Sequence, residues 1–120
     1  MKEFLSLRFP LESGIMTTIR LTTGGACSAV GLDLDLSEDC KVCVTEGLLL
    51  LMHAGFGIAC VRFMEEEGLN VRLTGEEQGE SAEQAEDEIS VALLEALAGS
   101  TAIVRTGGKV SEISFRFEKK

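Results

Sequence analysis

The sequence has no Trp and no Tyr, and it has only six Phe among 120 residues. A surface that stacks the bases of a nucleic acid needs exposed aromatic rings, and this chain has few to offer. Its core must therefore be built mainly from aliphatic side chains. Apolar residues make up 45% of the chain, which is ordinary for a packed globule. No internal repeat or linker is visible, so we expect one domain over residues 1–120.

Basic residues are also few, with 11 Lys and Arg against 20 Asp and Glu, which gives a formal net charge of -9. Such a charge repels phosphate backbones and anionic lipid, so neither a nucleic acid nor a membrane is an expected partner. The longest apolar segment, residues 47–60, is shorter than a bilayer span. No basic segment leads into an apolar stretch with a cleavage site. We therefore expect a cytoplasmic protein.

Because the chain has a single histidine, His53, it cannot form a His-rich metal site and has few side chains suited to acid–base catalysis. We expect it to be a capped or partly buried imidazole near a helix end. The sequence has no P-loop, no Gly-x-Ser-x-Gly and no paired histidines. Cys40 and Cys43 have the spacing of a redox or metal pair, but no second pair of ligands accompanies them. We predict that all four cysteines are reduced thiols packed in or near the core.

The hydrophobic pattern predicts five strands and three helices. The predicted elements are a strand at 3–9, helices at 12–30 and 37–53, strands at 57–64 and 69–73, a helix around 89–97, and a hairpin with strands at 101–106 and 109–117. Ser37 is the predicted N-cap of the second helix, and the acidic residues 75–84 are a predicted mobile loop. This order indicates an α/β (α+β) two-layer sandwich, a mainly antiparallel mixed sheet covered on one face by the helices.

Three stretches of the chain carry a resemblance to one family. They are "LRFPLESGIMTTIRLTTGGACSAVG", "LSEDCKVCVTEGLLLLMHAGFG" and "ISVALLEALAGSTAIVRTGGKVSEISFRFEK". In pattern and order they resemble the ATPase domain of bacterial anti-sigma-factor serine kinases, which belong to the histidine-kinase and gyrase-type (GHKL) ATPase superfamily. The resemblance implies a sigma factor or an anti-anti-sigma protein as partner, and a homodimer as a possible assembly.

The residues that bind the nucleotide in that family are missing here. The family has a catalytic Glu followed four positions later by an Asn that ligates magnesium. Glu46 matches the Glu, as a possible vestigial base, but Leu50 stands where the Asn is expected. An aliphatic side chain cannot ligate a hard cation. The ordinary interpretation of Glu46 is then an exposed or helix-surface glutamate.

The two other nucleotide elements of the family are absent as well. Residues 74–79 contain no Asp to bind adenine and lack the family's glycine spacing. The segment before the last helix has no phosphate-binding glycine, and residues 76–88 contain seven acidic and no basic side chains. We therefore expect a degenerate site that holds no cofactor and no metal.

These features favour a non-catalytic regulatory or protein-interaction module. One alternative is an ATP-dependent protein serine kinase with a rearranged site, and another is a domain that binds a small ligand in the emptied pocket. The acidic loop is either a solvated connector or a surface for a basic partner. The candidate partner-binding residues are Glu76, Glu77, Glu80 and Glu83.

Overall fold

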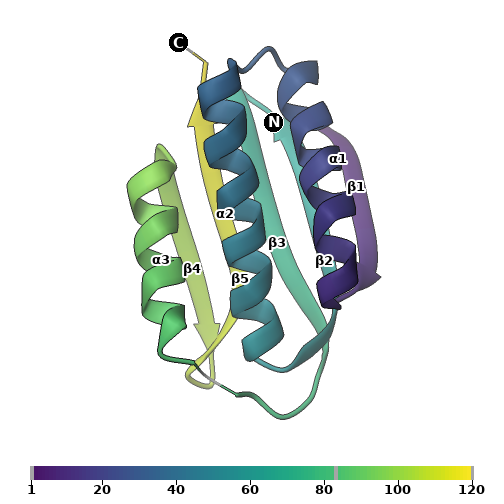
Figure 1. Ribbon diagram of the computed structural model, residues 1–120, viewed down its shortest axis with the longest axis vertical. Coiled ribbons are helices and arrows are strands. Elements are labelled where there is room, and N and C mark those ends of the chain that lie inside the picture. Colours follow the sequence, from purple (N-terminus) through teal and green to yellow (C-terminus); the bar gives the residue numbers. More distant parts are fainter. Residues whose placement is uncertain (1, 83, 120) are drawn as a thin grey trace.

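In a computed structural model, which describes residues 2–82 and 84–119, five strands and three α-helices follow one another along the chain (Figure 1). The elements are β1 (Lys2–Pro10), the short 3-10 helix η1 (Ser13–Ile15), α1 (Met16–Ala29), α2 (Leu34–His53), β2 (Phe56–Glu65), β3 (Gly68–Gln78), α3 (Glu86–Leu97), β4 (Ser100–Thr106) and β5 (Lys109–Glu118).

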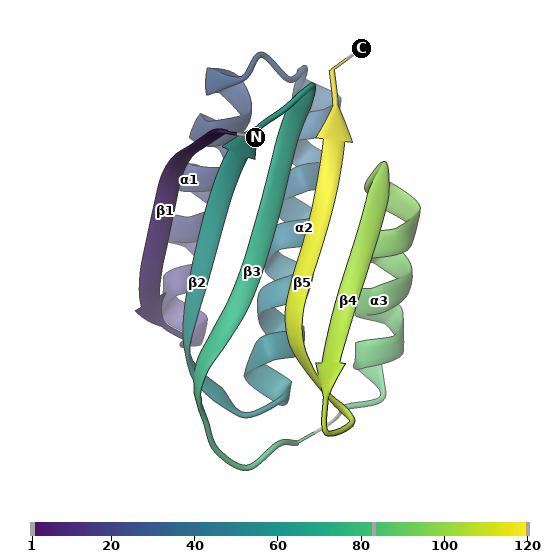
Figure 2. The same cartoon turned by 180° about the vertical axis from the view of Figure 1, so that it is seen from behind.

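The strands form one sheet in the order β1-β2-β3-β5-β4, and every neighbouring pair is antiparallel. All three α-helices lie on the same face of this sheet (Figure 1). Within residues 2–82 and 84–119 the opposite face carries no helix, as the view from behind shows (Figure 2). The predicted two-layer α+β sandwich is therefore confirmed.

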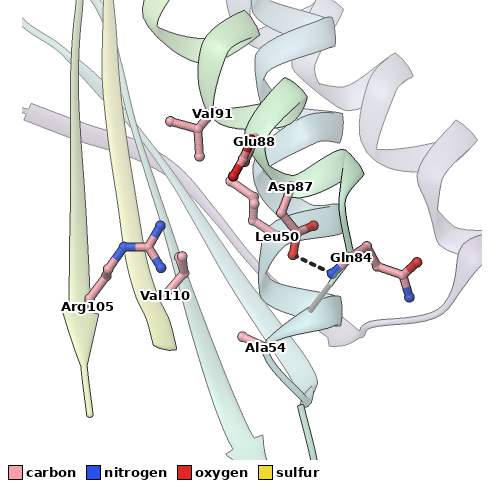
Figure 3. A pocket seen from close by; sticks show the side chains of 8 residues that line it. All are labelled: Leu50, Ala54, Gln84, Asp87, Glu88, Val91, Arg105 and Val110. Carbon is pink, nitrogen blue, oxygen red and sulfur yellow. Dashed lines mark hydrogen bonds between the residues drawn. The ribbon is translucent and has the colours of Figure 1, made fainter. Parts of the chain in front are cut away.

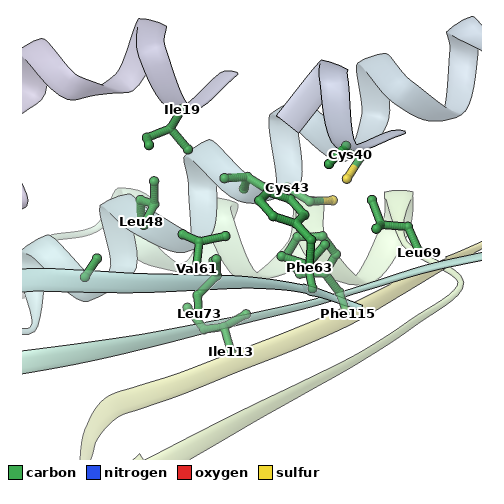
Figure 4. Packing of buried hydrophobic residues seen from close by; sticks show 14 of the residues in the cluster. Ile19, Cys40, Cys43, Leu48, Val61, Phe63, Leu69, Leu73, Ile113 and Phe115 are labelled. Carbon is green, nitrogen blue, oxygen red and sulfur yellow. The ribbon is translucent and has the colours of Figure 1, made fainter. Parts of the chain in front are cut away.

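The core lies between the helices and the covered face of the sheet (Figure 4). Strand side chains such as Val61, Phe63 and Phe115 point toward the helices, where Cys43 and Leu48 of α2 lie. In the last strand, the alternating residues Ile113, Phe115 and Phe117 are all buried. Three thiols, those of Cys27, Cys40 and Cys43, are also fully buried, whereas Cys60 is half-buried.

Two predicted boundaries are wrong. Helix α2 begins at Leu34 and not after Ser37, because the carboxylate of Asp33 accepts a 2.9 Å hydrogen bond from the backbone N–H of Leu36 and caps the helix. Strand β3 continues to Gln78, where it still pairs with β2. Residues 75–78 of the predicted loop are therefore strand.

Glycines with positive φ occupy two of the turns. Gly55 follows the C-cap of α2 at φ +96°, and Gly107 and Gly108 form the β4–β5 turn at φ 61° and 83°. Within the residues that the structure describes, no helix is both long enough and apolar enough to cross a membrane.

Candidate functional site

A cavity of about 360 Å³ lies where α2 and α3 meet the hairpin of β4 and β5 (Figure 3). Its floor is apolar, and its rim carries two carboxylates and one guanidinium. The lining residues are Leu50, Ala54, Gln84, Asp87, Glu88, Val91, Arg105 and Val110.

Leu50 places an aliphatic side chain where the resemblance expects a metal ligand. Its side chain is 3% exposed, and it lies in the floor of the cavity beside Ala54 (Figure 3). Helix α3 adds the carboxylates of Asp87 and Glu88, which repel a triphosphate and outnumber the single guanidinium of Arg105 on the rim. The residues present therefore do not fit a magnesium nucleotide.

Two polar links join α2 to α3 on either side of Leu50. Ser90 Oγ donates a 2.6 Å hydrogen bond to Glu46 Oε2, and His53 Nδ1 lies 2.6 Å from Asp87 Oδ1. On α2, Glu46, Leu50 and His53 follow one another at spacings of four and three residues, so all three share the helix face that meets α3.

Glu46 is consequently a part-buried structural acceptor. The expectation was an exposed or helix-surface glutamate. Glu46 does lie on the surface of α2 that meets α3, but it is half-buried there and not exposed, because its carboxylate accepts the hydrogen bond from Ser90, which is only 4% exposed. The expectation for His53 is confirmed, since its side chain is 23% exposed and bonded near the end of α2.

The β4–β5 hairpin supplies the only guanidinium among the lining residues. The pairing of the two strands shifts between Val104 and Arg105, so that Ser111 is left without a partner in the register. A bulge of this kind moves the side chains of the following residues to the other face of the sheet. It places Val110 on the helix side opposite Arg105, and both line the cavity (Figure 3).

Sequence reasoning missed the residues that define the rim of this cavity. Glu86, Asp87 and Glu88 were expected in or beside a repelling loop, but they form the first turn of α3. Asp87 there also accepts a 3.1 Å hydrogen bond from the backbone N–H of Gln84. Acidic residues before an apolar helical pattern are the signal that could have identified this N-terminus.

No protein-family model matches this sequence, and no curated protein sequence matches it significantly. Among residues 2–82 and 84–119, no group of three or more His, Cys, Asp or Glu side chains is arranged to hold a metal ion.

The candidate partner-binding glutamates that the structure describes, Glu76, Glu77 and Glu80, do not form one loop cluster. Glu76 lies on β3, where its Oε2 accepts a 2.8 Å hydrogen bond from Arg8 Nε. Glu77 is also in the strand, at φ 58°, and Glu80 follows it in the connection to α3. Glu83 lies outside the described residues. The prediction that Glu76 belongs to a mobile acidic loop is therefore wrong, because the residue is part of a strand and its carboxylate is paired with Arg8.

The connection from β3 to α3 is bonded to the end of α2 at two points. The backbone N–H of Gly79 donates to the carbonyl of Gly55 over 2.7 Å, and that of Ala82 donates to the carbonyl of His53 over 2.7 Å. These two bonds hold residues 79–82 beside the cavity.

A cluster of buried thiols lies between α1 and α2, away from the cavity. A hydrogen bond from Cys40 lowers the pKa of Cys27, and the same bond together with burial raises the pKa of Cys40 well above its ordinary value. Burial raises the pKa of Cys43 to about 12. These thiols serve as packing groups. They are buried, and each is either protonated or hydrogen-bonded to a neighbouring thiol.

Proposed function

We propose that the protein is a non-catalytic module that regulates a partner protein by binding it, as the resemblance to anti-sigma-factor kinases implies. The observation that carries this proposal is the buried Leu50 in the floor of a cavity with carboxylates on its rim. The partner is of the sigma-factor or anti-anti-sigma type, and the module works without a cofactor, with a homodimer as its possible assembly.

The distribution of charge supports binding through the helix layer. The three α-helices carry eight acidic and two basic side chains, whereas the five strands carry six acidic and seven basic ones. The helix layer therefore carries a net charge of -6 against +1 for the strands, and this negative charge attracts a basic partner and speeds their encounter.

Calorimetric titration with magnesium-ATP and magnesium-ADP tests the catalytic half of the proposal. We expect no heat of binding, since Leu50 offers no ligand to the metal and Asp87 and Glu88 repel the phosphates. A dissociation constant in the micromolar range would favour the serine-kinase alternative and overturn the proposal.

Affinity capture from the native lysate, followed by association kinetics with the captured protein, tests the binding half. The variant Glu77→Gln/Glu80→Gln should slow association several-fold at low salt, because it removes negative charge beside α2 and α3. Glu65→Gln/Glu66→Gln makes the same charge change at the β2–β3 turn and serves as the control. Equal association rates for both double variants would contradict the assignment of this surface.

The cavity itself favours a second candidate function, the binding of a small ligand. Its volume of about 360 Å³ is within the range of small-molecule sites, and its apolar floor meets polar groups only at the rim. A ligand with an aliphatic body and an ammonium group fits Leu50 and Val110 on one side and Asp87 and Glu88 on the other. Thermal shifts with a panel of aliphatic amines and amino acids test this candidate, and a flat response to all of them excludes that ligand class.

A further inference from the structure

Figure 2 shows the face of the sheet that no α-helix of the described residues covers. The strand registers place four of the six arginines of the chain on this face. They are Arg8 on β1, Arg62 on β2, Arg72 on β3 and Arg116 on β5. Arg62 and Arg72 are direct partners in the β2–β3 pairing. Like charges opposite each other destabilise a sheet, so this arrangement is an unfavourable one for folding alone.

A depression of about 220 Å³ lies beside two of these arginines, over β3, β5 and β4. Arg116 pairs with Asn70 on one side and Ser100 on the other, and Arg72 pairs with Ser114. The remaining outward residue at this place on β4 is Ala102, opposite Ser114. The depression exists because three adjoining side chains, Ser100, Ala102 and Ser114, are small. The sides of the depression are formed by larger side chains, which belong to Met64, Asn70, Arg72 and Arg116.

The acidic partners of these two arginines hold them weakly. Arg72 Nε lies 4.0 Å from Glu112 Oε1, at the outer limit of an ion pair. Arg116 Nη2 lies 3.0 Å from a carboxylate oxygen of Glu67 and 3.7 Å from one of Glu118, and both glutamates are more than half exposed. Exposed pairs of this kind contribute about 0–1 kcal/mol each, so an anion that enters the depression displaces them easily.

Arg116 also has an unsatisfied hydrogen-bond donor within the described residues. Its Nε is buried and has no hydrogen-bond partner within the part of the chain that the structure describes. An unsatisfied buried N–H is uncommon in folded proteins and calls for an explanation. This donor is closed to solvent in the present conformation, so an oxyanion reaches it only when the guanidinium turns toward the depression, where the group offers two parallel N–H donors to phosphate or carboxylate oxygens.

We propose that this depression is a binding site for an oxyanion, the phosphate or carboxylate group of a small ligand. Arg72 and Arg116 supply the positive charge, and the side chains of Asn70, Ser100 and Ser114 supply further hydrogen-bond donors around it. The site lies on the face of the sheet opposite the cavity, so it is independent of the function proposed above.

Nuclear magnetic resonance titrations with inorganic phosphate and, separately, with succinate test the site. Ionic strength is held constant with sodium chloride, and a sodium chloride titration alone is the reference. We expect both anions to shift the backbone amides of Ser100, Ala102 and Ser114 and the side-chain Nε–H of Arg116, with the amides of Val91 and Val110 in the cavity unchanged. The tighter of the two anions then identifies the oxyanion. Shifts no larger than those in sodium chloride overturn the proposal.

Three variants separate a built site from a general attraction. Arg116→Gln should weaken binding about tenfold or more, the factor expected from one charge-assisted hydrogen bond. Ala102→Leu keeps every charge but fills the depression, and it should weaken binding as well. Lys109→Gln removes one positive charge from the same strand, outside the depression, and should leave binding within about twofold of wild type. Equal loss in Arg116→Gln and Lys109→Gln, or full binding by Ala102→Leu, contradicts the proposal.

Discussion

Ser90 of α3 donates a 2.6 Å hydrogen bond to the carboxylate of Glu46 on α2, in a contact that is almost closed to solvent on the serine side. The family that the sequence resembles has a catalytic base at the position of Glu46. Here the carboxylate of Glu46 accepts a hydrogen bond from the neighbouring helix. This contact gives the glutamate a structural role that does not depend on a substrate.

Removing the hydroxyl of this pair should destabilise the fold. We expect Ser90→Ala to lower the free energy of unfolding by about 1–3 kcal/mol, because the carboxylate of Glu46 remains part-buried without its donor. Glu46→Gln keeps an acceptor oxygen and should cost less. Urea unfolding followed by far-UV circular dichroism measures both, since the chain has no Trp or Tyr to report by fluorescence. A loss in Glu46→Gln as large as that in Ser90→Ala would contradict the proposed role of the pair.

Leu50→Asn restores the amide that the resemblance expects, but it should not restore nucleotide binding. The carboxylates of Asp87 and Glu88 still line the cavity, and no adenine-binding Asp is present in residues 74–79. The variant should instead lose about 2–4 kcal/mol of stability, because an amide replaces a side chain that is 3% exposed. Calorimetry with magnesium-ATP and urea unfolding check the two parts. Micromolar binding by the variant would show that the rest of the nucleotide site is intact.

The sequence was sufficient to predict the element order and the covered face, because both follow from the spacing of apolar residues. Ile113, Phe115 and Phe117, for example, alternate strictly along β5 and are all buried. The extension of β3 to Gln78 was not predictable in this way, since it depends on pairing with β2 rather than on an apolar pattern of its own.

The charged residues of the site were the hardest part to predict. The ion pair between Arg8 and Glu76 joins residues 68 positions apart, and it forms only because β2 lies between their strands. The side of the sheet that Val110 faces depends on the bulge at Ser111, and simple alternation from Ile113 would have placed Val110 on the open face. Such features arise from register, which the local sequence does not encode.

Two glycines should respond in opposite directions to the same substitution. Gly55 has φ +96°, and a Cβ there would lie 2.6 Å from the carbonyl oxygen of Glu80. Gly55→Ala should therefore cost about 2 kcal/mol or more and loosen residues 79–82. Gly25 lies inside α1 with nothing within 4 Å of an added Cβ, so Gly25→Ala should stabilise by about 0.5–1 kcal/mol. Urea unfolding measures the stability of both variants. A stabilised Gly55→Ala would contradict the close approach of Gly55 to the carbonyl oxygen of Glu80.

The stability of the protein should fall at alkaline pH, and Cys43 should contribute to the fall. Burial first, and then the charges of Asp39 and Glu46, raise the pKa of this thiol from 9.0 to about 12. The folded state therefore keeps the proton of Cys43 at pH values where the unfolded state has lost it. The stabilisation is complete below about pH 9 and is lost as the pH rises toward 12.

Cys43→Ala removes this titration and should make the decline in unfolding free energy above pH 9 shallower by at most about 1.4 kcal/mol per pH unit, the limit for one proton. The variant also leaves a small gap in the core, but that loss is nearly the same at every pH, so the slope rather than the absolute stability is the readout. Urea unfolding in reducing buffer between about pH 8 and pH 11 measures the slope, and the absence of Tyr leaves only Cys and Lys side chains to titrate there. Val44→Ala, a truncation of a buried side chain on the same helix that carries no titratable group, is the matched control and should keep the wild-type slope. Parallel profiles for wild type and Cys43→Ala would mean that this thiol does not keep its proton on folding, and Cys40, whose pKa is also raised, would then be the remaining candidate.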